Sequence, residues 1–276
     1  MGMKLYAISD LHVNRAPNWE ALRALPPHLE DWLIVAGDVS ESEAQFAAAM
    51  GLLSQRFARV LWTPGNHDLW AHPNSPAQAR GIFKYNRLVS ICRAYGVLTP
   101  EDPYPVWPGA DGQAYVIAPI FTLYDYSFRP EDVSVEEAVA WAAETNIVST
   151  DEYYLFPDPF ASRQAWCAAR CRYTEGRLQS LNGDQALVLA GHFPLRQDLV
   201  QLYRIPRFSI WCGTRLTEEW HTRFAVKAVV HGHLHIRARH ERDGVPFHEV
   251  SLGYPHQWQA ARGVEGYLRQ VLPGEG

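Results

Sequence analysis

The sequence predicts an α/β fold whose parallel strands carry polar groups at one edge of a sheet. Short β-branched segments alternate with segments of helical periodicity, which is typical of parallel strands joined by right-handed crossovers. Several of the strands run directly into polar loops. Because sites in such sheets form just beyond the carboxyl ends of the strands, we expect these loops to meet.

The first half of the chain supplies three strands and two helices of this pattern. Strands are predicted over residues 4–9, 32–36 and 59–63, and helices over residues 19–25 and 41–57. Apolar residues recur at helical spacing in the second helix, at Phe46, Ala49, Met50 and Leu53. We expect Ser40 to be the N-cap of this helix.

The second half continues the strands after a different kind of segment. Further strands are predicted over residues 114–119, 186–190 and 226–230, and a hairpin over residues 236–240 and 245–251 around Asp243-Gly244. Residues 120–182 begin with an aromatic loop and continue into two helices, about 133–145 and 160–181. We therefore predict one domain over residues 1–276, with 120–182 as an insertion or lid.

Length and composition narrow the class of protein. A chain of 276 residues suits one large domain or two small ones, and 47% hydrophobic with 20% charged residues is ordinary for a soluble globular protein. The net charge of −5 argues against a dedicated nucleic-acid binder, which usually carries a basic excess. It leaves room for a small anionic substrate, because a bound metal can supply positive charge locally.

The sequence also predicts a cytoplasmic protein with reduced thiols. No apolar run approaches the roughly 20 residues of a membrane helix, and the N-terminus shows no signal-peptide pattern. Of the four cysteines, Cys167 and Cys171 lie four residues apart on a predicted helix, where a disulfide is sterically awkward. We expect these two, together with Cys92 and Cys212, to be free thiols.

Five polar motifs follow apolar strands along the chain. In order they are Asp10-Leu11-His12, Gly37-Asp38, Gly65-Asn66-His67-Asp68, Gly191-His192 and Gly232-His233-Leu234-His235. Any one alone is weak evidence, since a lone buried histidine is usually a hydrogen-bonded core residue. Together they would bury many carboxylate, imidazole and amide groups, each at a cost of several kcal/mol unless it is paired. A shared pair of cations would supply the partners.

These motifs resemble the signature of the calcineurin-like metallophosphoesterase superfamily, which reads D-x-H, G-D, G-N-H-D/E, a single His and G-H-x-H. The resemblance spans residues 10–235. It implies two packed β-sheets flanked by helices, with two metal ions at one end of the sandwich. The first ion would be held by Asp10, His12, Asp38 and His235. The second would be held by Asp38, Asn66, His192 and His233, so that Asp38 bridges the two.

Local geometry is expected to help these side chains converge. Within D-x-H and H-x-H, alternate residues of an extended chain point the same way, so both side chains reach the site. A glycine before each ligand is expected to let the backbone turn tightly with a positive φ.

The resemblance also assigns the chemistry around the metals. Two cations would neutralise phosphoryl charge and acidify a water. His67 would protonate the leaving oxygen or stabilise phosphoryl charge, and Glu41 either orients His67 or is a solvated acid at a helix start. Asp68 is expected to be a structural hydrogen-bond acceptor. The mixed oxygen and nitrogen ligands suit manganese, iron, zinc or cobalt, with Mn²⁺ favoured.

Substrate contacts are less firmly marked in the sequence. Tyr124 and Tyr126 of the aromatic loop, and Arg196 four residues after His192, are candidate substrate-binding residues. An arginine near a phosphate site can make bidentate contacts. Alternatively, the aromatic side chains pack the insertion onto the body and the arginine is solvated.

Further stretches resemble a group within the superfamily that hydrolyses phosphopantetheine from carrier proteins. They are TPEDPYPVW, LYDYSF, WCGT and GYP. This resemblance implies a phosphodiesterase whose partner is an acidic carrier protein. A phosphomonoesterase acting on proteins or nucleotides is the alternative, since its ligands would be identical. A non-catalytic scaffold is disfavoured, because scaffold members lose ligands that are all present here.

Overall fold

Two mixed β-sheets form the centre of the computed structural model, which describes residues 2–74, 79–109 and 112–274. The smaller sheet has the order β10-β1-β2-β3, formed by Arg269–Leu272, Leu5–Ile8, His28–Val35 and Phe57–Trp62. The larger has the order β4-β5-β6-β7-β9-β8, formed by Val106–Pro108, Ala114–Pro119, Ala186–Ala190, Val226–His231, Val245–Glu249 and Ala238–Arg242. Parallel pairing joins β1, β2 and β3, and also β5, β6, β7 and β9. The two-sheet architecture that the resemblance implied is confirmed.

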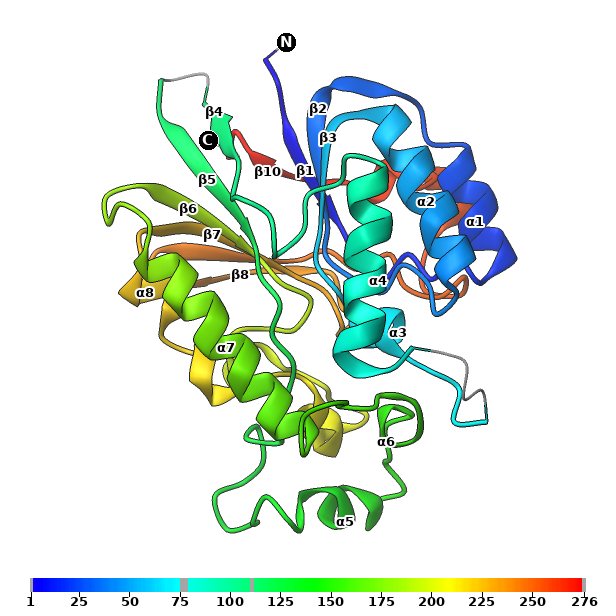
Figure 1. The fold of residues 1–276 in the computed structure, drawn as a ribbon, viewed down its shortest axis with the longest axis vertical. Coiled ribbons are helices and arrows are strands. Elements are labelled where there is room, and N and C mark those ends of the chain that lie inside the picture. The colour runs from blue at the N-terminus through cyan, green and yellow to red at the C-terminus, as the bar shows by residue number, and fades with distance from the viewer. Residues whose placement is uncertain (1, 75–78, 110–111, 275–276) are drawn as a thin grey trace.

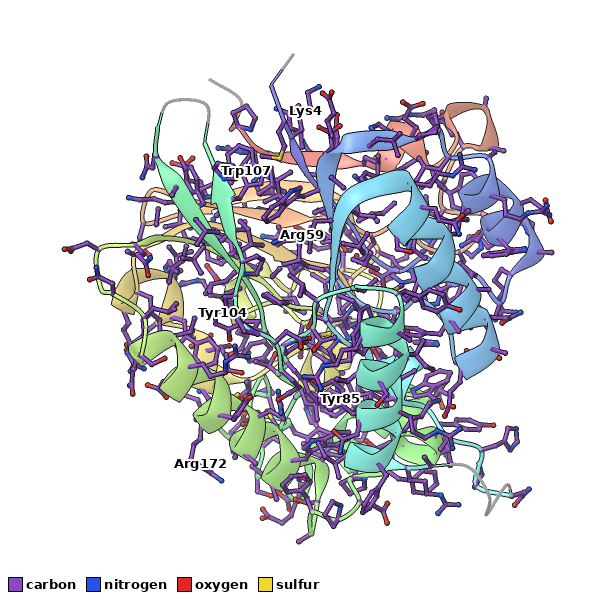
Figure 2. The ribbon with its side chains drawn as sticks, turned by 45° about the horizontal axis from the view of Figure 1, so that its top comes forward. Lys4, Arg59, Tyr85, Tyr104, Trp107 and Arg172 are labelled. Carbon is purple, nitrogen blue, oxygen red and sulfur yellow. The ribbon has the colours of Figure 1, made fainter. Side chains whose placement is uncertain are left out.

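Alternating side chains divide each central strand between two apolar layers. In β2, Trp32 and Ile34 belong to the layer between the sheets, whereas Leu33 and Val35 belong to the layer beneath the helices. This follows from the two-residue period of a strand. Trp107 of β4 is buried in the layer between the sheets (Figure 2).

Helices flank the two sheets (Figure 1). On the side of the smaller sheet lie α1 (Ala16–Arg23), α2 (Glu43–Arg56) and α4 (Gly81–Ala94), and on the side of the larger sheet lie α7 (Arg163–Gln179) and α8 (Trp220–Arg223). The short helices α3 (Asn66–Leu69), α5 (Ala138–Ala143) and α6 (Asp151–Tyr154) lie lower in the view. Tyr85 of α4 donates to Glu101, which also pairs with Arg170 of α7, so one carboxylate links the two groups of helices.

The first residue of α2 differs from the prediction. Ser42, not Ser40, is the N-cap, and its hydroxyl accepts a hydrogen bond from the Gln45 amide at 3.5 Å. The amides of Val39 and Ser40 donate to the Asp68 carboxylate at 2.8 and 3.0 Å. Residues 38–40 are therefore held as a loop, and the helix begins only after them.

Other predicted elements are confirmed with shifted ends. The hairpin pairs β8 with β9 antiparallel, and both turn residues have positive φ, at 53° for Asp243 and 75° for Gly244. The two helices predicted in residues 120–182 are present as the shorter α5 and α7. The prediction omitted α4, β4 and β10, as well as the four-residue helices α3, α6 and α8. All four cysteines are free and buried, as expected.

The two sheets meet immediately before the first polar motif. Ser9 donates its amide to the Val250 carbonyl at 3.2 Å and accepts from the Leu252 amide at 2.8 Å. This bridge fixes the position at which the chain leaves β1 for Asp10. Within the described ranges, no helix combines the length and apolar character needed to cross a membrane.

Candidate metal centre

All five polar motifs converge beyond the carboxyl ends of parallel strands, as predicted. Asp10 and His12 follow β1, Asp38 follows β2, His192 follows β6, and His233 and His235 follow β7. Asn66 and His67 come after β3, in the first turn of α3. Parallel strands deliver these segments to one edge because their carboxyl ends point the same way.

One group of side chains gathers around Asp10. The Nε2 atom of His235 lies 3.0 Å from Oδ1 of Asp10 and 3.3 Å from Nε2 of His12. The other carboxylate oxygen, Oδ2, accepts hydrogen bonds from the hydroxyls of Ser9 and Ser251 at 2.6 and 2.7 Å. Because donors engage Oδ2, Oδ1 is the oxygen that faces the two imidazoles.

A second group gathers around His192, which is fully buried. Its Nε2 atom lies 3.2 Å from Oδ1 of Asn66, 3.3 Å from Nδ1 of His233 and 3.5 Å from Oδ2 of Asp38. The described residues offer no hydrogen-bond partner for the buried Nε2 of His233. The structure thus brings all seven predicted ligands together in two adjoining groups.

Hydrogen-bond partners behind the cluster aim the Nε2 atoms of two of its histidines inward. Nδ1 of His192 donates to the Ala36 carbonyl at 2.8 Å, and Nδ1 of His235 donates to Oε1 of Gln257 at 2.8 Å. Each bond places a proton on Nδ1, so the neutral His192 presents an Nε2 lone pair to the cluster, and His235 turns its Nε2 toward Oδ1 of Asp10. Such convergence of oxygen and nitrogen acceptors fits divalent cations, which would relieve their mutual repulsion.

Burial and neighbouring charges set the protonation of the cluster. Burial lowers the pKa values of His12, His192 and His233, which favours the neutral imidazoles that bind metals. Burial would also lower the pKa of His235, but the Asp10 carboxylate raises it to about 9. Burial, reinforced by Asp10 and Asp68, raises the pKa of Asp38. Positive charge beside Asp38 would restore its ionised form.

The backbone at the cluster is strained at the ligand positions themselves. Left-handed φ angles occur at Asp10 (54°), His12 (40°), Asp38 (54°), His233 (71°) and His235 (53°). The expectation that D-x-H and H-x-H are extended is therefore wrong. Residues other than glycine adopt this region at a cost of about 1–3 kcal/mol each, and such strain gathers at functional sites. The side chains converge because the chain kinks at each motif.

The glycines of the motifs are required mainly for space. Only Gly37 among the four has a positive φ, at 87°, so the tight turn predicted before each ligand occurs there alone. A Cβ at Gly65 would lie 2.0 Å from Oδ1 of Asp38, and one at Gly232 would lie 2.4 Å from Oδ2 of Asp10. Glycine lets neighbouring backbone approach these carboxylates.

His67 stands beside the cluster and is held from two sides. Its Nδ1 atom donates to Oε1 of Glu41 at 3.1 Å, and its Nε2 atom lies 4.0 Å from Oδ2 of Asp38. Trp70 stacks on the imidazole with ring centroids 3.7 Å apart. The hydrogen bond from His67 lowers the pKa of Glu41, so the carboxylate is ionised near neutral pH. Glu41 contacts His67, in line with the first of its two predicted roles.

Asp68 acts as the structural acceptor that the sequence predicted. Its carboxylate accepts hydrogen bonds from the amides of Asp38, Val39, Ser40 and Gly65. These bonds tie the loop after β2 to the loop after β3, so Asp68 fixes Asp38 relative to Asn66.

The sequence prediction missed a buried carboxylate from residues 120–182. Oδ1 of Asp151 accepts from Nδ2 of Asn66 at 2.9 Å and from Nε1 of Trp70 at 2.6 Å. Asp151 thus turns the Asn66 oxygen toward His192 and holds the ring that stacks on His67. In the sequence, Thr150-Asp151-Glu152 reads as an ordinary acidic helix start, which gave no signal of this contact.

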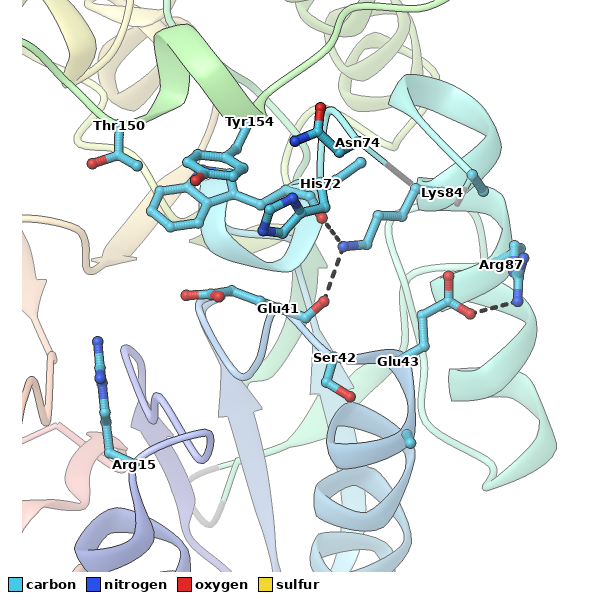
Figure 3. Close-up of a pocket in the computed structure, with 14 residues that line it drawn as sticks. Arg15, Glu41, Ser42, Glu43, His72, Asn74, Lys84, Arg87, Thr150 and Tyr154 are labelled. Atoms are coloured by element: carbon cyan, nitrogen blue, oxygen red, sulfur yellow. Dashed lines mark hydrogen bonds and ion pairs between the residues drawn. The ribbon is translucent and has the colours of Figure 1, made fainter. Parts of the chain in front are cut away.

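Two cavities share Trp70 and Thr150 as lining residues, and of these two only the smaller has predicted ligands on its walls. The smaller, of about 320 Å³, contains Asp38, Asn66 and His67 on its walls. The larger, of about 980 Å³, lies beside Glu41 and has charged walls (Figure 3). Figure 3 shows Lys84 donating to the backbone carbonyls of Glu41 and Trp70, and the Arg15 side chain standing apart from the labelled groups.

The three predicted substrate-binding residues line neither cavity. Tyr124 and Tyr126 are buried, and the Tyr126 hydroxyl donates to Glu152 at 2.7 Å. Arg196 donates to Asp198 at 2.8 Å. This placement favours the alternative in which the aromatic residues pack residues 120–182 onto the body.

A family model described as calcineurin-like phosphoesterase matches residues 3–237. The chain belongs to this family. This calcineurin-like phosphoesterase is a metal-dependent hydrolase of phosphate esters. Three groups of its carboxylate and imidazole side chains are candidate ligands for the divalent metal ions that the family implies. Within each group, the ligand atoms all lie within 4.8 Å of one another.

Individual proteins that resemble this phosphoesterase come from two branches of similarity, one in sequence and one in fold alone. It is 47% identical over 271 residues to the acyl-carrier-protein phosphodiesterase PptH of Mycobacterium tuberculosis, covering 98% of this chain and 83% of the relative. The crystal structure of phosphopantetheinyl hydrolase PptH from Mycobacterium tuberculosis matches with a TM-score of 0.92 and 46% identity, over 99% of this chain and 97% of that chain. A dimetal phosphatase from Danio rerio shares the fold, with a TM-score of 0.50 and 13% identity over 94% and 90% of the two chains.

Proposed function

We propose that this phosphoesterase hydrolyses the phosphodiester between a carrier-protein serine and 4′-phosphopantetheine, in the cytoplasm. The observation that carries the proposal is the 47% identity, across 98% of the chain, to a protein named as an acyl-carrier-protein phosphodiesterase. Water adds to phosphorus and the bond to the serine oxygen breaks. The products are free 4′-phosphopantetheine and a carrier protein with an unmodified serine.

The proposal places two divalent cations in the cluster, with Mn²⁺ favoured. Asp10, His12, Asp38 and His235 would hold one, and Asp38, Asn66, His192 and His233 the other. The Nε2 atoms of His192 and His235, which Ala36 and Gln257 turn toward the cluster, support these assignments. When bound, the cations supply positive charge to the phosphoryl oxygens and lower the pKa of water.

His67 is the proposed acid for the departing serine oxygen. Glu41 holds Nδ1, so Nε2 is the atom that faces the cluster, 4.0 Å from Asp38. A serine alkoxide is a poor leaving group, and a proton from Nε2 turns it into a hydroxyl as its bond to phosphorus breaks. The stacked Trp70 restricts the imidazole to this orientation.

The paired cavities support a diester substrate over the alternative monoester. A phosphodiester has two substituents on phosphorus, and the smaller cavity, which has residues of the cluster on its walls, adjoins the larger cavity at Trp70 and Thr150. A phosphomonoesterase needs room for one substituent only. We also propose that residues 120–182 form an insertion or lid on a single domain, since Val148, Ser149 and Thr150 help to line the smaller cavity.

The test is the reaction itself. Purified enzyme is stripped with a chelator, reloaded with Mn²⁺ and incubated with a phosphopantetheinylated carrier protein. Mass spectrometry should show loss of the arm from the carrier and appearance of 4′-phosphopantetheine, with no reaction before reloading. Hydrolysis of nitrophenyl phosphate monoesters without any release from the carrier would instead favour a phosphomonoesterase.

A further inference from the structure

An apolar wall adjoins the polar cluster inside the smaller cavity. Its side chains come from two separate segments of the chain: Val148 from residues 120–182, and Leu202, Ile205 and Phe208 from the turns and 3₁₀ helix that follow β6. The ring of Phe208 stacks toward that of His233, with centroids 6.0 Å apart. The wall therefore begins at the edge of the cluster.

Phosphate and cations gain nothing from such a wall. Val148 and Ile205 are 44% and 42% exposed. Removing such apolar surface from water is favourable, so a bound ligand that covers these side chains would gain affinity. Other apolar side chains are as exposed or more so elsewhere, such as Leu29 at 66%, but Val148 and Ile205 share a cavity with Asp38, Asn66 and His67. A ligand whose phosphoryl group lies at the cluster would cover them with the group next to phosphorus.

We infer that this wall is the subsite for the branched end of the pantetheine arm, an inference that rests on the proposed function. The arm carries two methyl groups on the second carbon from its ester oxygen, so these methyls stay close to phosphorus in any bound pose. A wall that begins at His233 meets this requirement.

The remaining half of the diester belongs on the other side of the cluster. His67 contacts Glu41, and Glu41 lines the larger cavity with Arg15, Glu43 and Lys84. The serine oxygen that His67 protonates departs toward this charged cavity. The carrier protein is thereby directed to the charged larger cavity, and the branched arm to the apolar wall of the smaller cavity.

Substitutions in the wall test the assignment against three phosphodiesters. Ile205→Ser and Val148→Ser remove apolar surface, and Ile205→Leu preserves it. Leu29→Ser is the matched control, because Leu29 is an exposed apolar residue in β2 that lines neither cavity. The substrates are a phosphopantetheinylated carrier protein, a short serine peptide bearing the same arm, and methyl 4-nitrophenyl phosphate.

Both serine variants in the wall should lower kcat/KM for the two arm-bearing substrates about tenfold relative to methyl 4-nitrophenyl phosphate. Affinity for free 4′-phosphopantetheine, measured by calorimetry, should fall by a similar factor. Ile205→Leu and Leu29→Ser should retain the wild-type ratio. Unchanged ratios would overturn the inference, and so would a loss confined to the folded carrier, which would make the wall a protein contact. A wild-type enzyme that cleaves only the nitrophenyl ester would overturn the proposed function as well.

Discussion

The polar cluster and the walls around it are built in opposite ways. The cluster rests on the ends of parallel strands, most of its side chains are buried, and donors or acceptors behind it fix their orientation. The apolar wall of the smaller cavity comes from segments between the strands, and its side chains, such as Ile205, are half-exposed. The difference separates two tasks. Strand ends supply geometry for the chemistry, and the irregular segments supply surface for a particular substrate.

The largest effect is expected at the centre of the cluster. Asp38→Asn removes the negative charge proposed to be shared by two cations, so both ions should bind weakly and activity should fall by orders of magnitude. Elemental analysis and turnover of a diester measure the two losses. The melting temperature of the metal-free protein should change little, because the Asp38 side chain belongs to neither apolar core and Asn keeps its size. Two tightly held ions with near-normal turnover would show that Asp38 is not the bridging ligand.

The next effect separates leaving-group chemistry from metal binding. His67→Ala should keep both metals, and it should slow alkyl diesters roughly 10²–10⁴-fold, as expected for a lost general acid. Nitrophenyl esters should slow much less, because a nitrophenolate stabilises its own charge. The loss should lie mainly in kcat. Equal losses on both substrate types would assign His67 to stabilising phosphoryl charge, and loss of metal would make it a ligand.

A smaller effect is expected at Asp151, which links residues 120–182 to the cluster. Asp151→Ala removes the acceptor for Asn66 and Trp70, so the Asn66 oxygen and the His67 ring both lose their orientation. Losses of about 10–100-fold in metal affinity or activity are typical for partners behind a ligand. Asp151→Asn keeps an acceptor oxygen and is the matched control, with a milder loss. Normal metal content and kcat in Asp151→Ala would contradict this role.

The sequence predicted the cluster far better than the rest of the fold. Each motif directly follows an apolar strand, and a strand end dictates where the next residues lie. The helix α4 went unpredicted because its N-cap is Arg80, which makes no side-chain capping bond, so no start signal marks it. The strand β10 is only four residues long and pairs with β1 from the other end of the chain. Such a pairing depends on tertiary contacts that local patterns do not contain.

The same reason explains why the sequence predicted the wrong residues for the cavity walls. Distance from His192 along the sequence drew attention to Arg196, and aromatic content drew attention to Tyr124 and Tyr126. The structure instead lines the cavity with Val148 and Ile205, which belong to no motif or periodic pattern. Proximity in sequence predicts proximity in space at a strand end, where direction is fixed, but not in the irregular segments that follow.

The smallest effect is expected at Arg196 and sharpens this contrast. Its guanidinium donates to Asp198, which also accepts from Arg242 at 2.6 Å, so the three side chains form a partly exposed ion-pair network. Arg196→Ala should leave kcat/KM for a phosphopantetheinylated carrier within about twofold of wild type. The melting temperature should fall only slightly, since exposed ion pairs contribute about 0–1 kcal/mol. Arg196→Gln keeps most of the length of the side chain but removes its charge, so it controls for lost packing. A tenfold rise in KM for the carrier in both variants, with unchanged turnover of a nitrophenyl diester, would show that Arg196 contacts the carrier after all. The position four residues beyond His192 would then have been a better guide to substrate binding than the cavity walls.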